Sequence, residues 1–362
     1  MTDYRYIFGT LRTERVVEEI PCYGVIMNMK INQGGDFQGT FQLDQTGKDN
    51  ATLLSACIPG RTWVACERNG KAIWHGYIWS RVYSAQSKSV QLFAQSFENY
   101  PKKRIIHSDL SYAAVEQRNI YRDLWNTMQA PTGGSLNINV PSVFPTVVTK
   151  DLEVKASDFK AYDNVMSSIS DGVNGFDWYI QITKDGINYR KDLLIGYPNL
   201  GSPANDAMNV FEYPGNITQY YFTEPMSDAG TDIYVLGAGE GSDMIVGTAF
   251  DAAAITSGSP IWEEVVSSKY INDLDIANSL AAQELFIREP PMAVVKVFVK
   301  GNLTPEFGSY NLGDTCKIVI KDPRFPGFGF SGNKRLLKWE LTPQSSSGVE
   351  EAQLVFEGDP DI

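Results

Sequence analysis

The chain has 362 residues, of which 43% are hydrophobic and 20% charged, and its formal net charge is −12. This composition is typical of a folded globular protein, and the length is sufficient for two or three domains. The acidic balance argues against a protein that reads nucleic acid, because such proteins carry an excess of Lys and Arg that neutralises phosphates. No stretch approaches the roughly 18 apolar residues of a membrane helix, and the N-terminus lacks the apolar segment of a signal peptide, so we expect no membrane insertion.

Residues 1–100 have the pattern of short strands, over 4–11, 15–20, 24–31 and 39–43. The clearest local signal is Asn69-Gly70, which lies between two runs of alternating character and predicts a type I′ hairpin. Two further strands are predicted over 77–83 and 89–95. So many short strands with regularly spaced turns favour a barrel or a sandwich.

Residues 101–210 are predicted to form a small α+β domain. Apolar residues recur at helical spacing over 111–128 and over 157–170, where Ser157 is a suitable N-cap and Gly172 a suitable stop. The runs 176–183 and 187–195, joined through Asp185-Gly186, predict another hairpin.

Strands return after residue 210, with a helix among them. We predict strands over 219–222, 232–236 and 244–247, a helix over 274–288 and four final strands over 293–300, 315–321, 336–342 and 352–357. Pro290 and Pro291 end the helix, because proline cannot donate into the helical ladder.

A weak internal repeat links the two β-rich regions. Gly60-Arg-Thr62 begins a strand–turn–strand–turn–strand pattern that ends in Val90-Gln-Leu-Phe93, and Gly313-Asp-Thr315 begins a similar one that ends in Ala352-Gln-Leu-Val-Phe356. The copies differ by an insertion over 322–333. Chance similarity between two hairpins is the alternative explanation.

The predicted fold is therefore mainly β with α+β insertions: two similar β-barrel domains, a small α+β domain between them and a helical insert in the second barrel. The predicted boundaries are 1–100 for the first barrel, 101–210 for the α+β domain, 211–248 with 292–362 for the second barrel, and 249–291 for the insert.

No motif predicts an active site, a metal site or a cofactor site. The segment Gly237–Gly241 departs from the dinucleotide fingerprint because its sixth position is Ser242 and an apolar strand follows, so a hairpin turn is the better interpretation. The four cysteines show no C-x-x-C spacing and are expected to be plain buried or half-buried thiols. His75 lies on a predicted hairpin strand and His107 in a predicted linker, so neither is predicted to be a catalytic base.

Several segments resemble minor tail proteins of long-tailed phages that infect actinobacteria. They are Tyr6-Ile-Phe-Gly-Thr-Leu-Arg12, Pro59-Gly-Arg61, Asn69-Gly-Lys-Ala-Ile-Trp-His-Gly-Tyr-Ile-Trp79, Leu92-Phe-Ala-Gln-Ser-Phe97 and Gly172-Val-Asn-Gly-Phe-Asp-Trp178. The helix Ala277–Arg288, the strand Val294–Val299 after it and the later Leu312-Gly-Asp314 are similar to phage tail-hub and late-control-type proteins.

The resemblance implies a tail-tip hub: a homotrimer with two barrels per subunit that joins a six-fold tail tube to a three-fold tip. It implies a structural protein of the virion tail tip, assembled in the host cytoplasm, without enzymatic activity. Its implied partners are a distal tail or tail tube protein, the tape measure protein and downstream tip or receptor-binding proteins, with DNA only in passage. Many hubs carry an added hydrolase or fibre domain, which is not evident here. The alternatives are a carbohydrate-active enzyme of the cell envelope, which needs two acids in a cleft, and a receptor-binding tip module, which would expose clustered aromatics.

Two features make further predictions for a hub. Phe325, Phe328 and Phe330 lie among Gly and Pro in the predicted insertion, which is too apolar for a loop left in water, so they contact either a partner or their own barrel. Three chains of −12 together carry −36, and a basic channel would hold passing DNA. We therefore expect a neutral or acidic channel wall, unless the acidity merely solubilises the outer surface.

Overall fold

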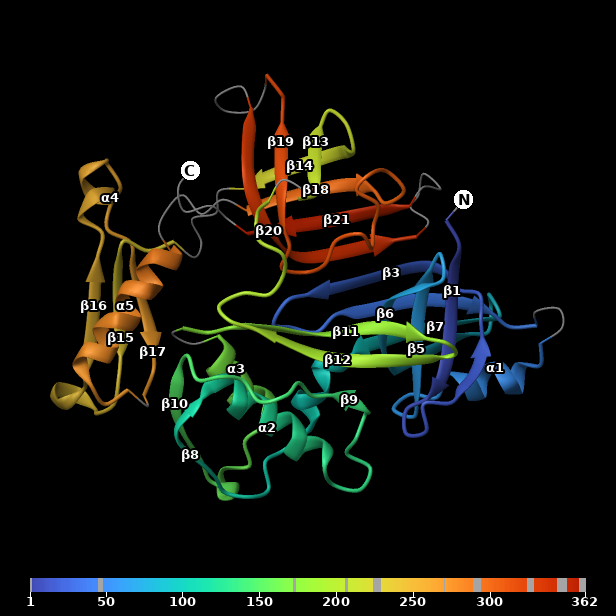
Figure 1. The fold of residues 1–362 in the computed structure, drawn as a ribbon, viewed down its shortest axis with the longest axis horizontal. Coiled ribbons are helices and arrows are strands. Elements are labelled where there is room, and N and C mark those ends of the chain that lie inside the picture. The colour runs from blue at the N-terminus through green and yellow to red at the C-terminus, as the bar shows by residue number, and fades with distance from the viewer. Residues whose placement is uncertain are drawn as a thin grey trace. The chain divides into compact units, whose positions relative to one another are not determined.

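The structure is a computed structural model, and it describes residues 2–44, 48–171, 174–205, 208–223, 229–269, 271–288, 294–323, 329–343 and 350–357 (Figure 1). The chain divides into two compact units. The first comprises Met1–Thr218 and Phe298–Leu354, and the second comprises Gln219–Val297 and Val355–Ile362. The fold is mainly β, as predicted.

The N-terminal region forms seven strands and one short helix. They are β1 (Tyr4–Thr10), β2 (Val16–Glu19), β3 (Tyr23–Lys30), β4 (Asp36–Gln42), α1 (Asn50–Ala56), β5 (Thr62–Arg68), β6 (Lys71–Ser84) and β7 (Ser89–Ser96). The predicted type I′ hairpin is confirmed, because Asn69 and Gly70 both have positive φ (50° and 78°) and join antiparallel β5 and β6. Helix α1 was not predicted, and its signal in the sequence is Asp49, whose side chain caps the helix by accepting from the Thr52 N–H.

The α+β region contains three helical elements and five strands. They are β8 (Leu110–Glu116), α2 (Gln117–Gln129), β9 (Ile138–Asn139), β10 (Thr149–Val154), η2 (Ala156–Asp158), α3 (Tyr162–Ser170), β11 (Asp177–Asp185) and β12 (Asn188–Gly196). A 3-10 helix, η1 (Phe97–Lys103), leads into it. The predicted hairpin is confirmed as β11 and β12, in which Asp185 pairs with Asn188 and the turn consists of Gly186 and Ile187.

The predicted helix over 111–128 is wrong in its first third, which forms strand β8. Lys150 pairs with Val115 and Leu152 with Tyr112, so three steps on β8 face two on β10. Because of this bulge, where Ala114 has φ 51°, Tyr112 and Val115 lie on the same face of the strand although they are three positions apart. Because three is also a helical spacing, the apolar pattern indicated a helix.

The second predicted helix begins later than expected. A 3-10 turn forms over 156–158, and Phe159 then adopts a left-handed conformation with φ 48°, which interrupts the chain before α3 begins at Tyr162. Ser157 therefore does not cap α3. The predicted stop, Gly172, lies outside the described residues.

The α+β region and the first β region share one hydrophobic core. Ile120, Leu124 and Trp125 of α2 belong to the same buried cluster as Trp63 of β5 and Tyr77 of β6. The region is therefore packed against the N-terminal strands.

The C-terminal β region continues the same sheet. Its strands are β13 (Val210–Tyr213), β14 (Ile217–Thr223), β18 (Val294–Lys300), β19 (Thr315–Ile320), β20 (Phe330–Thr342) and β21 (Glu351–Phe356). The 13-stranded sheet has the order β14-β18-β21-β20-β3-β4-β7-β6-β5-β1-β2, with β19 on β20 and β13 on β19. Among the described residues the strands form open sheets, and no closed barrel is found.

The second compact unit contains a three-stranded sheet with a helix on it. Its elements are β15 (Asp232–Leu236), η3 (Gly241–Asp243), β16 (Val246–Phe250), α4 (Ala252–Thr256), β17 (Glu263–Ser267) and α5 (Leu274–Arg288). The strand order is β16-β15-β17, and the predicted helix over 274–288 is confirmed as α5. The turn predicted at Gly237–Gly241 joins antiparallel β15 and β16 and is also confirmed. Strand β15 pairs with both β16 and β17 in this separate sheet, whereas the sequence analysis assigns 232–236 and 244–247 to the second barrel. The domain boundaries themselves stay a prediction.

Helix α5 packs closely on this sheet because β16 has a glycine beneath it. A Cβ on Gly247 would lie 2.2 Å from the backbone carbon of Ala277.

Within the described part of the chain, no helix is long and apolar enough to cross a membrane.

Candidate functional site

The repeated strand pattern predicted from the sequence is present in the structure. Strands β5, β6 and β7 form one antiparallel meander, and β19, β20 and β21 lie in the corresponding order. Gly60 and Gly313, which precede the two copies, both have positive φ (69° and 87°). The strand order of the repeat is therefore confirmed.

The correspondence extends beyond the three strands predicted. In the sheet, β3-β4-β7-β6-β5-β1 matches β14-β18-β21-β20-β19-β13 strand for strand, and the chain visits both sets in the same sequence. One difference is direction, because β1 is antiparallel to β5 whereas β13 is parallel to β19. Strands β15–β17 and helix α5 are inserted between β14 and β18, where the first set has only the turn between β3 and β4.

The two sets meet at a direct strand pairing. Strand β20 lies antiparallel to β3, with Trp339 opposite Met29 and Leu341 opposite Met27. These residues are buried, so the sheet continues from one set to the other without a solvent gap at this pair.

A buried ionic cluster ties the same two sets together. Arg68, at the end of β5, donates from Nε and Nη2 to the carboxylate of Glu350, with distances of 2.8–3.2 Å. Its remaining donors reach the carbonyl oxygens of Phe307 (2.9 Å) and Gly301 (3.0 Å), and the Tyr4 hydroxyl donates to Glu350 at 2.6 Å. The side chains of Arg68 and Glu350 are only 5% and 4% exposed.

The electrostatics of this cluster favour the charged form of Arg68 and the neutral form of Tyr4. Burial alone would lower the pKa of Arg68, but the hydrogen bonds and charge of Glu350 raise it above its usual value. Burial raises the pKa of Tyr4, and the bond to Glu350 raises it further. The cluster thus holds β1, β5 and the segment between β18 and β19 to the start of β21.

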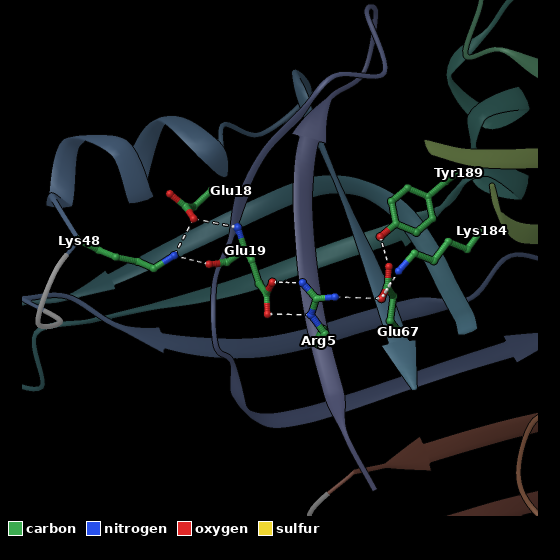
Figure 2. A network of polar contacts seen from close by, with 7 residues as sticks. All are labelled: Arg5, Glu18, Glu19, Lys48, Glu67, Lys184 and Tyr189. Carbon is green, nitrogen blue, oxygen red and sulfur yellow. Dashed lines mark hydrogen bonds and ion pairs between the residues drawn. The ribbon is translucent and has the colours of Figure 1, made fainter. Parts of the chain in front are cut away.

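A second polar network fixes the α+β hairpin to the first β set (Figure 2). Glu67 of β5 is 1% exposed and accepts from Lys184 of β11 at 2.8 Å and from the hydroxyl of Tyr189 of β12. Arg5 of β1 lies between Glu67 (3.8 Å) and Glu19 of β2. Burial and the bond to Glu67 raise the pKa of Tyr189. The network orients the hairpin relative to strands β1, β2 and β5.

Of the predicted partner-contact loop, the structure describes one phenylalanine. Phe330 begins β20, pairs with Ile320 and is half-buried, with the Lys334 ammonium 5.7 Å from its ring centre. Phe325 and Phe328 lie outside the described residues. The contact made by this loop stays a prediction.

The histidines and cysteines considered in the sequence lie in different surroundings. His75 is buried and burial holds its pKa well below the usual value, whereas His107 is exposed. All four cysteines are free thiols, and three of them are buried. Within the described residues there is no cluster of three or more His, Cys, Asp or Glu side chains that could hold a metal ion.

Comparison with known proteins identifies the fold. No protein-family profile matches the chain, and no curated protein matches it in sequence. Among solved structures, it is similar to the 43 kDa tail protein of prophage MuSo2 from Shewanella oneidensis, with 9% identity, 99% of both chains covered and a TM-score of 0.66.

Two further tail proteins superpose over nearly their whole length. A tail protein from Neisseria meningitidis MC58 is 11% identical, with 98% of this chain and 97% of that chain covered and a TM-score of 0.62. Prophage tail protein gp18 from Listeria monocytogenes EGD-e is 11% identical, with 97% and 94% covered and a TM-score of 0.57. The chain thus has the fold of phage tail and baseplate hub-like proteins.

Proposed function

We propose that the chain is a structural hub of a phage tail tip, a homotrimer in a long-tailed phage of the kind that infects actinobacteria. It joins the six-fold tail tube to a three-fold tip and surrounds the channel for DNA. Its partners are the distal tail or tail tube protein, the tape measure protein and the downstream tip or receptor-binding proteins.

The observation that carries the proposal is the matched strand order of the two β sets. Three subunits with two similar sets each present six similar units around one axis, so a three-fold assembly can meet a six-fold one. The proposal treats each set as one small barrel of the ring. The β20–β3 pairing and the Arg68–Glu350 cluster hold the two sets of one subunit together.

A map of the intact tail by cryo-electron microscopy tests the proposal. We expect three copies at the tip, contacting through unlike faces in a closed ring, with the strands of both β sets around the axis. A single copy, or copies placed along the tail shaft, would contradict the hub assignment. Light scattering on the purified chain measures its molar mass and so shows whether the trimer forms without its partners.

Part of one sheet face is uncharged and suits a channel wall, and the next residue of β4 on that face is the acidic Asp36. Across β4, β7 and β6, two rows of side chains lie on one face of the sheet: Gln38, Phe93 and Ser80, and Thr40, Gln91 and Val82. None of the six carries a charge. Because each phosphate–lysine contact strengthens DNA binding, such a face lets DNA pass without holding it.

Charge substitutions on this face test its role. The pair Gln38→Lys and Gln91→Lys would place six lysines in a trimer, and we expect assembled tails that release DNA more slowly. The matched pair Gln38→Glu and Gln91→Glu should release DNA at the normal rate. Normal release by both pairs would remove this face from the channel, and failed assembly of both would make it a protein interface.

The loop between β19 and β20 is proposed to contact a partner. Replacing Phe325, Phe328 and Phe330 with Ser should leave the chain folded but block its incorporation into tails. Loss of folding would instead show that these rings pack on their own subunit.

A further inference from the structure

The three-stranded sheet of the second compact unit has two faces of different kinds. Helix α5 lies across one face (Figure 1), where Val235 is opposite Gly247 and Gly247 lies against the backbone of Ala277. Because side chains alternate along a strand, the neighbours of these residues point to the other face, which we call the outer face. Three rows of side chains cross it over β16, β15 and β17: Phe250, Asp232 and Glu263; Thr248, Tyr234 and Val265; and Val246, Leu236 and Ser267. None of these nine residues is buried.

The outer face is more apolar than a solvated sheet face usually is. A sheet with one solvated face normally places its polar residues outward, and parallel strands such as β15 and β17 are usually covered on both faces. Five of the nine outward residues are apolar or aromatic: Tyr234, Leu236, Val246, Phe250 and Val265. Leu236 pairs with Val246 and Tyr234 with Val265, so these residues form a contiguous patch, in which Val265 is 60% exposed. Contiguous exposed apolar surface marks an interaction site.

The dimensions of the outer face indicate a narrow partner. Three strands about 4.8 Å apart, with five residues each at about 3.3 Å, give an area of roughly 14 by 17 Å. This is roughly a third of the 800 Å² or so per partner that joins two folded proteins stably. One α-helix of about 11 residues has the matching length and width. The opposite face of the same sheet is likewise covered by one helix, α5.

The charges of this unit favour a basic partner. Residues 229–288 contain nine Asp or Glu and only two Lys or Arg, which accounts for more than half of the net charge of −12. Asp232 and Glu263 are direct neighbours at one end of the outer face, and none of its nine residues is basic. Arg288 of α5 is engaged by Glu284. Such a surface repels nucleic acid, anionic lipid and a second copy of the same unit, and it attracts lysine and arginine.

We propose that the outer face binds one basic amphipathic helix of another tail protein. The apolar side of that helix covers Tyr234, Leu236 and Val265, and its lysine or arginine side chains reach Asp232 and Glu263. The aliphatic stems of those basic side chains add to the apolar contact. The inference deepens the hub function by naming one contact surface and the chemistry of its partner. It rests on the proposed function for the source of the helix.

Fluorescence anisotropy on the purified full chain tests the surface with a defined probe. The probe is a labelled helical peptide of about 14 residues, long enough to cross the face, with leucine on one side and lysine on the other. In the matched control peptide, glutamate replaces each lysine. We expect the lysine peptide to bind saturably, one per chain, with a dissociation constant in the micromolar range that rises with added salt. The absence of saturable binding, or equal binding of both peptides, would overturn the proposal.

Three variants decide whether the outer face is the binding surface. Val265→Ser removes an apolar side chain that is largely exposed, so the chain should stay folded and its affinity for the lysine peptide should fall about fivefold. Ile187→Ser makes a comparable change at an 80% exposed position in the turn between β11 and β12, and it should bind like the unchanged chain. Glu263→Lys should weaken binding of the lysine peptide and strengthen binding of the glutamate peptide. Equal affinity of all four chains for the lysine peptide would refute the assignment.

Photo-cross-linking in assembled tails identifies the natural occupant. With p-benzoylphenylalanine in place of Val265, we expect a cross-link to a segment of another tail protein that has apolar residues at helical spacing together with lysine or arginine. A cross-link to a second copy of this chain, to its own first compact unit or to an acidic segment would overturn the proposed occupant, and so would the absence of a cross-link. The peptide assay uses the isolated chain, so a chain that binds the lysine peptide but is absent from tails would refute the hub function and leave the surface standing.

Discussion

Breaking the Arg68–Glu350 pair should be strongly destabilising, because it would leave a buried charge without its partner. In Glu350→Gln, Arg68 is left with two carbonyl acceptors and with the carboxylate of Glu306, which lies 3.9 Å away on a 59% exposed side chain and so compensates the buried charge only weakly. Removing one member of a buried pair costs about 3–5 kcal/mol. At about 2 °C per kcal/mol for a chain of this size, the melting temperature should fall by roughly 6–10 °C.

The double variant Arg68→Met with Glu350→Leu gives the matched control. Replacing both charges with apolar groups removes the desolvation cost as well as the attraction, so the double variant should lose much less than the two single variants added together. The cycle consists of the unchanged chain, Arg68→Met, Glu350→Leu and the double variant. Urea unfolding of these four chains gives the coupling free energy. A loss below about 1 kcal/mol for Glu350→Gln, or additive losses in the double variant, would refute the reasoning.

Three further predictions concern single positions. Burial raises the pKa of Glu98 to about 7 from its usual 4.5, so the unfolded chain loses this proton at a lower pH than the folded chain. The free energy of unfolding therefore falls as the pH rises from about 4.5 to 7. Glu98→Gln should therefore flatten that fall and raise the melting temperature at pH 8; an unchanged pH profile would contradict it. Gly247→Ala should destabilise the second compact unit by about 2 kcal/mol or more, seen as faster proteolysis there, because its Cβ would meet the backbone of Ala277. Phe159→Asn should stabilise the chain by about 1 kcal/mol, since Phe159 is 67% exposed in a left-handed conformation that Asn adopts more readily; calorimetry measures it, and a lower melting temperature would count against the strain.

Local signals were reliable where neighbouring residues decide the conformation. The Asn69-Gly70 hairpin needs positive φ at two adjacent positions, and helix α5 needs only its own apolar stripe and a cap from Asp273. The meander over β5–β7 and its counterpart over β19–β21 could also be predicted from the sequence, because each is built from consecutive strands. The correspondence of β1, β3 and β4 with β13, β14 and β18 was not predicted strand by strand, since these strands are not all consecutive in the sheet and come from distant parts of the chain.

Local signals failed where a partner strand or a backbone irregularity decides. The segment 111–116 has apolar residues at a helical spacing, and only its pairing with β10 across a bulge makes it a strand. The left-handed Phe159 likewise interrupts a pattern that is helical in its side chains. In both places the side-chain spacing is compatible with two structures, and a contact outside the segment selects one.

The sequence alone therefore determined the mainly β character, the hairpins, helix α5 and the existence of a repeat, because these depend on residues close together in the chain. Only the tertiary structure decided that β20 pairs with β3, that β15 and β16 join β17, and that Arg68 meets Glu350 across 282 positions. The sequence does not mark such pairings, because any apolar strand or opposite charge of suitable pattern could supply the partner. Closing these long loops costs entropy that only the assembled sheet and core repay, so the choice is made by the fold as a whole.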